Sequence, residues 1–541
     1  MSRPTHRDAC QAFRWEESAR AMGFVAGEPV NLGRAIVDRH AGAGRPALRW
    51  FGKRGETRTY TFDELARLTG RFAHVLRARG IGRGDRVAGF LPRIPEMLIA
   101  MIGTWKAGAV YVPIFTGFGP DAIDFRVRHS GTRALCTQWE HRARLPEPLP
   151  DGVTIITVAG EAGGVSGDVD FWRAMDGQPE TTAPAAGRRD EPAVLLYTSG
   201  STGLPKGVKI AANFLVAIHP HLVHGADLRP DDVFWPTGDP GWGYGLVCYM
   251  GALALGVPVV SHEAAPTPEF CLARLRELGV TNLATTPTLL RGVMAQGAAA
   301  AGDGHLRVRS ASSCGEPLNA EVVRFFREHW GVTVRDQYGS SELGLPIGNF
   351  ATIEMPVKPG SMGLPLPGCT MAVVDDAGHE VGPDVVGHVG MKPHPEGYYS
   401  LGYWNDEDRD REMYRGEWLT CGDLARRDGE GYFWFEGRAD DVIKSAGYRI
   451  GPFEVESAIL KHPAVAEAAV VGKPDALRGQ IVKAYVVLKP GRAARGGLET
   501  EIADVVKRQL GRHQYPREVE FVDQLPKTET GKIQRFLLRR R

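Results

Sequence analysis

The sequence predicts an α/β protein with a large N-terminal domain and a small C-terminal one. Three observations favour this class. Its 541 residues are more than one hydrophobic core usually supports. Strand-like and helix-like segments alternate from Thr61 to Trp330, which is typical of a helix-covered, largely parallel sheet. From about Gly360 the strands shorten and glycines become frequent, so we expect several subdomains followed by a compact α+β unit.

The N-terminal elements follow from capping residues and apolar spacing. Thr61 and Glu64 form a capping box, and apolar residues then recur at helical spacing as far as Leu76. The segments expected after this helix are strand Arg86–Leu91, helix Pro95–Ala107, strand Val110–Pro113, strand Thr281–Thr286, helix Pro287–Ala295, strand Arg307–Ser312 and helix Pro317–Trp330. The longest apolar run, Leu246–Val260, is too short and too interrupted to span a bilayer, so we expect it in the core.

Two stretches mark the domain organisation. Residues 140–190 are rich in Pro, Gly, Ala and Glu and are expected to be a surface connection. A boundary is expected at Arg438–Asp441, which gives domains 1–437 and 438–541, although a plain linker remains an alternative for this polar segment. The elements expected beyond it are helix Phe453–Lys461, strand Val465–Val471, strand Val482–Leu488, helix Leu498–Leu510 and strand Glu518–Val522.

Composition excludes several classes of protein. The net charge of +1 provides no global attraction to nucleic acid or to a membrane surface. The seven cysteines are scattered without a C-x-x-C pair, which disfavours a disulfide framework or a zinc site and favours a reducing cytoplasm. Residues Arg535 and Arg539–Arg541 form a basic C-terminal cluster, for which a solvated helix end is favoured over a polyanion site.

The loop Tyr197–Val208 carries the strongest chemical signal. It contains three glycines, four Ser/Thr hydroxyls and Lys206, a combination that suits a polyphosphate. It differs from the nucleotide P-loop, because Pro205 precedes the lysine and the strand-like Val208–Ile210 follows in place of a helix. Taken alone, a flexible surface loop with a chance lysine explains it equally well.

Four other segments combine glycine with charge. They are Cys314–Pro317, Asp336–Glu342, Trp418–Asp423 and Pro526–Lys532. Each has a structural alternative: Gly315-Glu316-Pro317 suits a helix cap, Ser341-Glu342 and Asp423 suit turns, and Gly531-Lys532 suits a hairpin tip. No single segment decides the function.

In order, these segments resemble the motifs of the adenylate-forming superfamily, which includes acyl- and aryl-CoA ligases, adenylation domains and luciferases. Tyr338–Glu342 resembles its Y-G-x-[ST]-E motif, and Gly422-Asp423 its G-D motif. Gly437–Ile450 resembles its G-R-x-D-D-x-I-K-x-x-G-Y-R-I hinge, and Pro526–Lys532 its closing P-K-T-x-x-G-K. The resemblance covers roughly residues 30–540, and Gly447–Glu456 is most similar to short- and medium-chain acyl-CoA synthetases.

The resemblance implies ATP, Mg²⁺ and CoA as ligands and assigns roles for acid activation. Lys532 would bridge the carboxylate and the α-phosphate, Glu342 would bind Mg²⁺, and Thr198 would act with the phosphate loop. The implied nucleotide-binding residues are Thr198, Ser199, Gly200, Ser201, Thr202, Gly203 and Lys206 for the β- and γ-phosphates; Gly315, Glu316, Pro317, Asp336, Gln337 and Tyr338 around adenine; Gly339 and Ser340 in the same motif; Ser341 at the α-phosphate; Asp423 at the ribose; and Arg438 at the ribose or phosphate.

The resemblance also implies a second step in another conformation. The C-terminal domain would be mobile and rotate about Asp440 to bring in CoA. Ala446, Gly447, Tyr448 and Arg449 would then line the pantetheine tunnel, with Arg449 and Arg478 near the CoA phosphates. A turn glycine and surface arginines remain the alternative.

Acyl specificity is expected from two positions. Acetate-specific relatives carry a tryptophan where this chain has Gly339, so acetate should be a weak substrate and a longer or aromatic acid a better one. Trp242 and Tyr244 either narrow the pocket or belong to the core.

The sequence thus favours an AMP-forming acyl-CoA synthetase for short- to medium-chain acids, whose partners are the acid, ATP and CoA, and not nucleic acid. An aryl acid or a carrier-protein acceptor is the main alternative. The misplaced lysines disfavour a P-loop NTPase or kinase, and the presence of both Glu342 and Lys532 disfavours a non-catalytic nucleotide-binding regulator.

Overall fold

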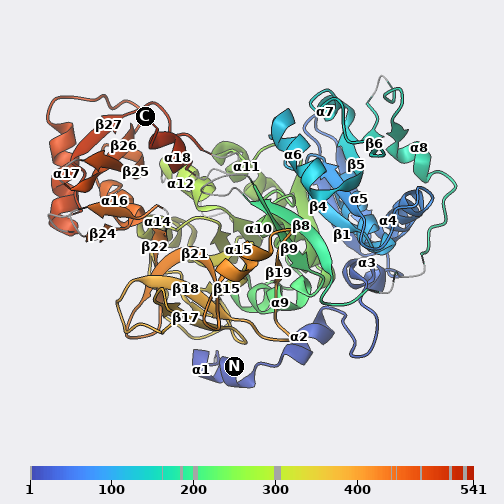
Figure 1. The fold of residues 1–541 in the computed structure, drawn as a ribbon, viewed down its shortest axis with the longest axis horizontal. Helices are drawn as coiled ribbons and strands as arrows, with labels where there is room; N and C mark the ends of the chain where they lie inside the picture. Colours follow the sequence, from blue (N-terminus) through green and yellow to red (C-terminus); the bar gives the residue numbers. More distant parts are fainter. Residues whose placement is uncertain are drawn as a thin grey trace.

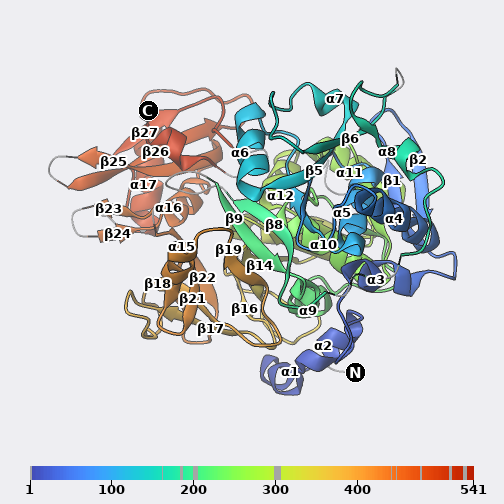
Figure 2. The same ribbon diagram turned by 45° about the vertical axis from the view of Figure 1, so that its right-hand side comes forward.

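The fold was analysed in a computed structural model. It describes residues 3–540 except 161–162, 183–184, 186, 199–204, 298–305, 440, 446–447, 476–477, 511–513 and 528–532. Within the described residues the strands form four sheets, and helices cover the two largest. The C-terminal sheet lies at one end of the molecule, drawn in red in Figures 1 and 2.

The largest sheet has nine strands and is parallel from β14 to β1. Antiparallel strands extend it at both edges. Its strands, in spatial order, are β16 (Leu364–Pro365), β15 (Gly344–Gly348), β14 (Val334–Ser340), β13 (Ser310–Cys314), β12 (Asn282–Thr285), β10 (Phe234–Pro236), β11 (Val259–His262), β1 (Pro46–Phe51) and β2 (Thr57–Thr61).

The second sheet has eight strands and is parallel from β8 to β7. Its strands are β19 (Ser400–Tyr403), β9 (Lys206–Ala211), β8 (Pro192–Thr198), β4 (Val110–Pro113), β3 (Arg86–Phe90), β5 (Thr132–Gln138), β6 (Thr154–Val158) and β7 (Val169–Asp170). The expectation that residues 140–190 only connect elements over the surface is wrong, because β6 and β7 extend the sheet and Ile156 and Phe171 are fully buried.

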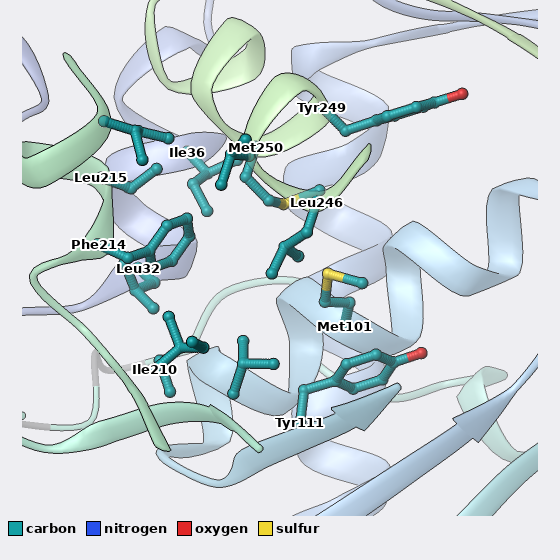
Figure 3. Packing of buried hydrophobic residues seen from close by; sticks show 14 of the residues in the cluster. Leu32, Ile36, Met101, Tyr111, Ile210, Phe214, Leu215, Leu246, Tyr249 and Met250 are labelled. Carbon is teal, nitrogen blue, oxygen red and sulfur yellow. The ribbon is translucent and has the colours of Figure 1, made fainter. Parts of the chain in front are cut away.

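Helices cover these sheets and supply the main core. They are α1 (His6–Ala12), α2 (Trp15–Ala21), α3 (Leu32–Ile36), α4 (Phe62–Arg77), α5 (Pro95–Ala107), α6 (Pro120–Ser130), α7 (Trp139–Arg142), α8 (Phe171–Met175), α9 (Phe214–Pro220), α10 (Gly243–Ala254), α11 (Pro268–Leu278), α12 (Pro287–Ala295), α14 (Ala320–Trp330) and α15 (Glu407–Glu412), with short turns η1 (Asp38–His40) and η2 (His221–Gly225). Figure 3 shows Met101 of α5, Ile210 of β9, Phe214 of α9 and Leu246 of α10 packed together.

Several local predictions are confirmed. The capping box begins α4, where the Glu64 amide donates to Thr61 Oγ1 at 3.1 Å and the Thr61 amide donates to Glu64 Oε2 at 2.9 Å. The apolar run Leu246–Val260 forms most of α10 and the start of β11, and Leu246 and Met250 are fully buried. No helix in the described part of the chain is both long and apolar enough to cross a membrane.

The two remaining sheets belong to the C-terminal third of the chain. One contains β17 (Thr370–Val374), β18 (Gly387–Lys392), β21 (Trp418–Arg427), β20 (Tyr414–Arg415) and β22 (Phe433–Arg438). The other contains β24 (Tyr448–Ile450), β23 (Ile443–Ser445), β26 (Gly479–Leu488), β25 (Val465–Asp475) and β27 (Glu518–Phe521), covered by α16 (Pro452–Ile459), α17 (Leu498–Gln509) and α18 (Arg535–Leu538).

The chain changes sheet between Arg438 and Ile443, and the last sheet has an apolar cluster of its own that runs from Ile443 to Val506. The division into domains 1–437 and 438–541 remains a prediction. The expectation of a solvated C-terminal helix end is wrong for Arg535, because its side chain is only 21% exposed and its guanidinium forms an ion pair with Glu456 at 2.8 Å.

Candidate functional site

The candidate site lies where strands of three sheets end close together. β8, β13 and β14 are parallel strands whose carboxyl ends carry three of the sequence motifs, and β21 carries the fourth. Ligands of open parallel sheets usually bind at the carboxyl ends of their strands. This arrangement brings together side chains that are far apart in the sequence.

The phosphate-loop motif is closed by an antiparallel pair of strands. Thr198 at the end of β8 is the register partner of Lys206 at the start of β9. The two ends of the loop are therefore neighbours, and β9 confirms the strand expected after Lys206. Ser199, Gly200, Ser201, Thr202 and Gly203 lie outside the described residues.

Tyr403, which sequence analysis missed, connects this loop to Glu342. Lys206 Nζ lies 5.5 Å from the centroid of the Tyr403 ring, and the Tyr403 hydroxyl donates to Glu342 Oε1 at 2.9 Å. Ser400 on the same strand donates to the Glu342 carbonyl oxygen at 2.7 Å. Burial and the Glu342 carboxylate together raise the pKa of Tyr403 far above its usual value, which keeps the hydroxyl protonated and able to donate.

Glu342 fits a magnesium site that is completed by a substrate. Among the described residues no cluster of three or more His, Cys, Asp or Glu side chains forms a protein cage for a metal. Glu342 Oε2 makes no hydrogen bond or ion pair with a described residue, so one carboxylate oxygen is available to a cation. Mg²⁺ is commonly held by one or two carboxylates together with substrate phosphates.

A compact polar network surrounds Asp423. Tyr338 on β14 donates its hydroxyl to Asp423 Oδ2 at 2.7 Å, and Arg438 Nη1 at the end of β22 lies 3.1 Å from Asp423 Oδ1. Arg438 also donates to the Cys421 carbonyl oxygen at 3.0 Å. Asp423 Oδ2 also accepts from Cys421 Sγ at 3.4 Å, so both oxygens of this buried carboxylate are held, and Oδ1 keeps a lone pair for a further donor.

Asp336 fixes the segment between β13 and α14. Its carboxylate accepts hydrogen bonds from Ser313 Oγ at 3.0 Å and from the Leu318 amide at 3.4 Å, and burial raises its pKa to about 8. The backbone of Gly315 has φ +101°, which favours glycine. These contacts keep the chain out of a helix until Asn319 caps α14, so the predicted helix start at Pro317 is three residues early.

Glu316 and Gln337 direct their side chains into the protein. Glu316 accepts from Arg291 at 2.5 Å and from Thr288 at 2.6 Å, so it is neither a helix cap nor solvated. Gln337 is 2% exposed; it donates to the Asn349 carbonyl oxygen at 2.9 Å, and its Oε1 lies 3.2 Å from His221 Nδ1. The polar side chains of Glu316 and Gln337 thus have hydrogen-bond partners within the protein and do not need a ligand. Pro317 is partly buried and follows Glu316 directly.

Gly339 is tightly packed. A Cβ at this position would lie 2.1 Å from the carbonyl oxygen of Gly344 and 2.7 Å from Leu345 Cδ2. Ser340 Oγ accepts from the Leu343 amide at 3.1 Å, which fixes the turn that follows, and Ser341 is partly buried beside it. The absence of a tryptophan at position 339 was expected to leave open space, but protein atoms already fill the space beside the Cα of Gly339.

The two aromatic candidates for the acyl pocket differ. Trp242, partly buried at the start of α10, packs against Phe115 and Phe118 with ring centroids 5.7 and 6.0 Å away. Its Nε1 is buried and makes no hydrogen bond to a described residue. Tyr244, in contrast, has its hydroxyl 2.9 Å from Ser312 Oγ, which agrees with the core alternative.

The C-terminal candidates are only partly described. Asp440, Ala446, Gly447 and Lys532 lie outside the described residues. Tyr448 and Arg449 belong by backbone to β24 and pair with Ser445 and Lys444 of β23. Arg478 lies in the turn between β25 and β26, where its amide donates to Asp475. Ser445 of β23 pairs with Gly479, which directly follows Arg478 in the chain, so Arg478 lies close to the end of β23.

A cavity of about 320 Å³ opens beside Lys206, between α6, β9 and α15. Lys206 and Arg409 supply its cationic lining, and Phe125, His129, Tyr403 and Trp404 supply its ring lining. Arg409 and Tyr403 lie outside the sequence motifs. The pairing of β19 with β9 brings Tyr403 here, and Arg409 lies on the helix α15 that follows β19. Sequence analysis also missed Arg291, which donates to Glu316, because the two residues are 25 positions apart in the chain and meet only in the fold.

Comparisons with known proteins agree with this geometry. The family described as AMP-binding enzyme matches residues 37–404, and the AMP-binding enzyme C-terminal domain matches residues 454–532. An acetyl-coenzyme A synthetase of Bacillus subtilis (strain 168) is 35% identical, with 99% of this chain and 94% of that protein covered.

Two crystal structures are similar over nearly the whole chain. An acyl-CoA synthetase of Brucella canis is 39% identical with a TM-score of 0.79, covering 99% of this chain and 98% of that one. A benzoate CoA ligase from Burkholderia xenovorans LB400 is 29% identical with a TM-score of 0.82, covering 94% and 100%. The chain therefore belongs to the AMP-binding enzyme family, the adenylate-forming superfamily that its sequence motifs resemble.

Proposed function

We propose that this chain is an AMP-forming acyl-CoA synthetase, which converts a carboxylic acid, ATP and CoA into acyl-CoA, AMP and pyrophosphate. The observation that carries the proposal is the meeting of Lys206 and Glu342 at Tyr403. A loop lysine and a carboxylate with a free oxygen, separated by one side chain, suit the binding of a magnesium–polyphosphate. The similarity of the whole chain to acid–thiol ligases supports the same reaction.

In the first half-reaction a carboxylate oxygen attacks the α-phosphorus of ATP. The new O–P bond forms as the bond to pyrophosphate breaks, and pyrophosphate leaves with the electron pair. Bound Mg²⁺ would neutralise charge on the phosphates. Thr198 and Lys206, with residues 199–203, hold the β- and γ-phosphates, and Ser341 contacts the α-phosphate. Lys532 bridges the two reacting anions, so its charge counts most in the transition state.

The adenosine side uses the network around Asp423. Asp423 accepts the ribose hydroxyls, and Tyr338 and Arg438 hold its carboxylate in place. The segments 315–317 and 336–338 line adenine. Because the side chains of Glu316 and Gln337 already bind neighbouring protein groups, their backbone atoms are the ones that face the base.

In the second half-reaction the thiol sulfur of CoA attacks the acyl carbon. The bond between that carbon and the phosphate oxygen breaks, AMP leaves with the electron pair, and the thiol proton passes to solvent. Rotation about Asp440 replaces Lys532 with the segment 446–449, which lines the pantetheine path, while Arg449 and Arg478 bind CoA phosphates. The same geometry serves a carrier-protein thiol, for which the arginines would be dispensable.

Short- to medium-chain fatty acids are the proposed substrates. The acetyl-CoA synthetase relative supports a small acid, whereas the cluster of Trp242, Phe115 and Phe118 supports the alternative of an aromatic acid, as does the similarity to a benzoate CoA ligase. Trp242 rather than Gly339 is the residue that limits the pocket. The expectation that acetate is a weak substrate rests on open space at Gly339, which the packing there does not provide, so the acid panel below tests it directly. We also assign the enzyme to the cytoplasm, where its seven free thiols would stay reduced.

The test is carboxylate-dependent ATP–pyrophosphate exchange across a panel of aliphatic and aromatic acids, followed by AMP release with CoA. Exchange without a carboxylate, or ADP as the product, would exclude the proposal. Lys532→Ala should lose ~10²–10³-fold in exchange yet still convert supplied acyl-AMP and CoA to acyl-CoA. Equal loss of both half-reactions would assign Lys532 a different role.

A further inference from the structure

The C-terminal helix α18 is tied to the residue that follows the proposed hinge. Arg539 forms an ion pair with Asp441 Oδ1, and Arg535 Nη1 lies 3.6 Å from Asp441 Oδ2. The Asp441 side chain is 19% exposed, so water screens these contacts less than it screens a pair at the open surface. Two cations from one end of the chain therefore converge on one carboxylate.

Arg535 is itself anchored in the C-terminal core. Its Nη2 donates to both oxygens of the buried Glu456 on α16, at 2.9 and 2.8 Å, and its Nε donates to Oε1 at 3.2 Å. Glu456 Oε1 also accepts from the Val470 amide at 2.8 Å. Asp441 is thus connected through Arg535 to both α16 and β25.

The flanks of the segment 528–532 are fixed to the same sheet. Lys527 and Ile533 form an antiparallel bridge, and the Gln534 amide donates to the Pro526 carbonyl oxygen at 2.8 Å. Leu538 is buried against Tyr485, whose hydroxyl donates to the Leu538 carbonyl oxygen at 3.1 Å. Lys532 is three residues before Arg535 in the sequence, so α18 follows it directly after Ile533 and Gln534.

The other side of the hinge belongs to a different sheet. Arg438 ends β22 and binds Asp423 of β21, whereas the next strand, β23, belongs to the C-terminal sheet. Asp441 lies between them. Its amide donates to the Arg438 carbonyl oxygen at 2.9 Å, and its carboxylate is held by Arg535 and Arg539, which are both C-terminal. Beyond residue 440, Asp441 is the first point where the chain is fixed to the part expected to rotate.

We propose that Asp441 is a positioning residue for acid activation, because its ion pairs with Arg539 and Arg535 make the hinge and the anchor of the Lys532 segment turn as one body. The inference rests on the proposed function and on the role given there to Lys532. If the clamp is loosened, rotation about the hinge no longer delivers the lysine accurately to the α-phosphate. Thioester formation does not use Lys532, so it should not depend on the clamp.

The experiment measures both half-reactions separately in the full-length protein. Asp441→Asn and Arg539→Gln are each expected to lower the rate of ATP–pyrophosphate exchange about tenfold or more, with conversion of supplied acyl-AMP and CoA within about threefold of wild type. The double variant should be no slower than the slower single variant, because the two substitutions remove the same ion pair between Asp441 and Arg539. Arg539→Lys, which keeps the charge, should recover part of the exchange rate.

Arg540→Ala is the matched control, since Arg540 belongs to the same tail, is exposed, and lies 5.9 Å from the centroid of the Phe536 ring. It should match wild type in both assays, and unchanged thermal melting would show that each variant is folded. Equal loss of both half-reactions in folded Asp441→Asn, additive losses in the double variant, or unchanged exchange would each overturn the inference. Wild-type exchange that needs no carboxylate would instead overturn the proposed function, and the inference with it.

Discussion

The two sides of the candidate site are built differently. On the ribose side, both oxygens of Asp423 are occupied, by Tyr338 at 2.7 Å and Arg438 at 3.1 Å. On the proposed metal side, only one oxygen of Glu342 is held, by Tyr403 at 2.9 Å, and the other makes no hydrogen bond or ion pair with a described residue. The first arrangement is set before a ligand arrives, while the second leaves a coordination position open.

The difference suits what each side is proposed to bind. Ribose hydroxyls are neutral donors, so a fixed, fully oriented carboxylate recognises them at little cost in reorganisation. A magnesium ion carries two charges and takes most of its ligands from phosphates and water, so the protein needs to supply one unshielded oxygen. Substitutions on the ribose side should therefore lower the affinity for ATP, whereas substitutions on the metal side should lower the turnover rate.

Removal of the Glu342 charge should have the largest effect. Glu342→Gln keeps an oxygen for Tyr403 but weakens the cation site, so the maximal exchange rate should fall ~10²–10³-fold with little change in melting temperature. Titration with Mg²⁺ at saturating ATP measures the effect. Exposed Glu354→Gln serves as the control and should match wild type, whereas a normal magnesium dependence in Glu342→Gln would contradict the proposed role.

Asp423→Asn should have the next largest effect and should act on affinity. The neutral amide no longer pairs with Arg438 and accepts the ribose hydroxyls less strongly, so KM for ATP should rise ~10–100-fold with a smaller change in kcat. Because Asp423 is buried, the free energy of unfolding should also fall by about 1–3 kcal/mol. Steady-state kinetics and denaturant unfolding measure these changes. If kcat fell while KM for ATP stayed unchanged, the assignment of Asp423 to ribose binding would be wrong.

Tyr403→Phe should have a smaller effect than either carboxylate variant. It removes the donor to Glu342 but leaves the ring against Lys206, so the exchange rate should fall about 3–10-fold and the magnesium requirement should rise. Tyr414→Phe, at a residue that is 49% exposed, provides the control. A loss as large as that of Glu342→Gln would mean that the hydroxyl acts directly on substrate.

The smallest effect is expected behind the ribose side, where β22 meets α16. Burial, and the neighbouring Glu454 carboxyl of α16, raise the pKa of Glu436 on β22 above its usual value. The unfolded chain releases this proton at lower pH than the folded chain, so the free energy of unfolding should fall as pH rises above about 4.5. Glu436→Gln should remove this dependence and stabilise the protein by about 1 kcal/mol near pH 8.

Thermal melting from about pH 5 to about pH 8 tests this prediction, with the wild type and variant converging at the acidic end. Parallel curves for the two proteins would show that Glu436 is ionised throughout. The same variant should leave KM for ATP close to that of wild type, since Glu436 contacts Arg426 and Glu454 and is not part of the Asp423 network.

The sequence predicted those elements whose ends are marked locally. Helix α5 has both predicted ends, because Pro95 begins it and Gly108 ends it with φ +87°. Residues 140–190 were misjudged because their strands are short and flanked by polar, glycine-rich stretches, so burial depends on distant neighbours. The motif residues were found from their order, whereas Tyr403 was missed because its contact with Glu342 spans 61 residues and depends on sheet pairing.

The packing of Gly339 has a consequence for how acyl selectivity can change. A side chain there would collide with the carbonyl oxygen of Gly344, at 2.1 Å from the Cβ, and the left-handed backbone of Gly344 gives the turn little room to yield. Neither natural evolution nor protein engineering could introduce a bulky residue at position 339 by a single substitution and keep this turn. The change would require a compensating rearrangement of residues 340–345, so altered chain-length preference is more accessible through Trp242 and its aromatic neighbours.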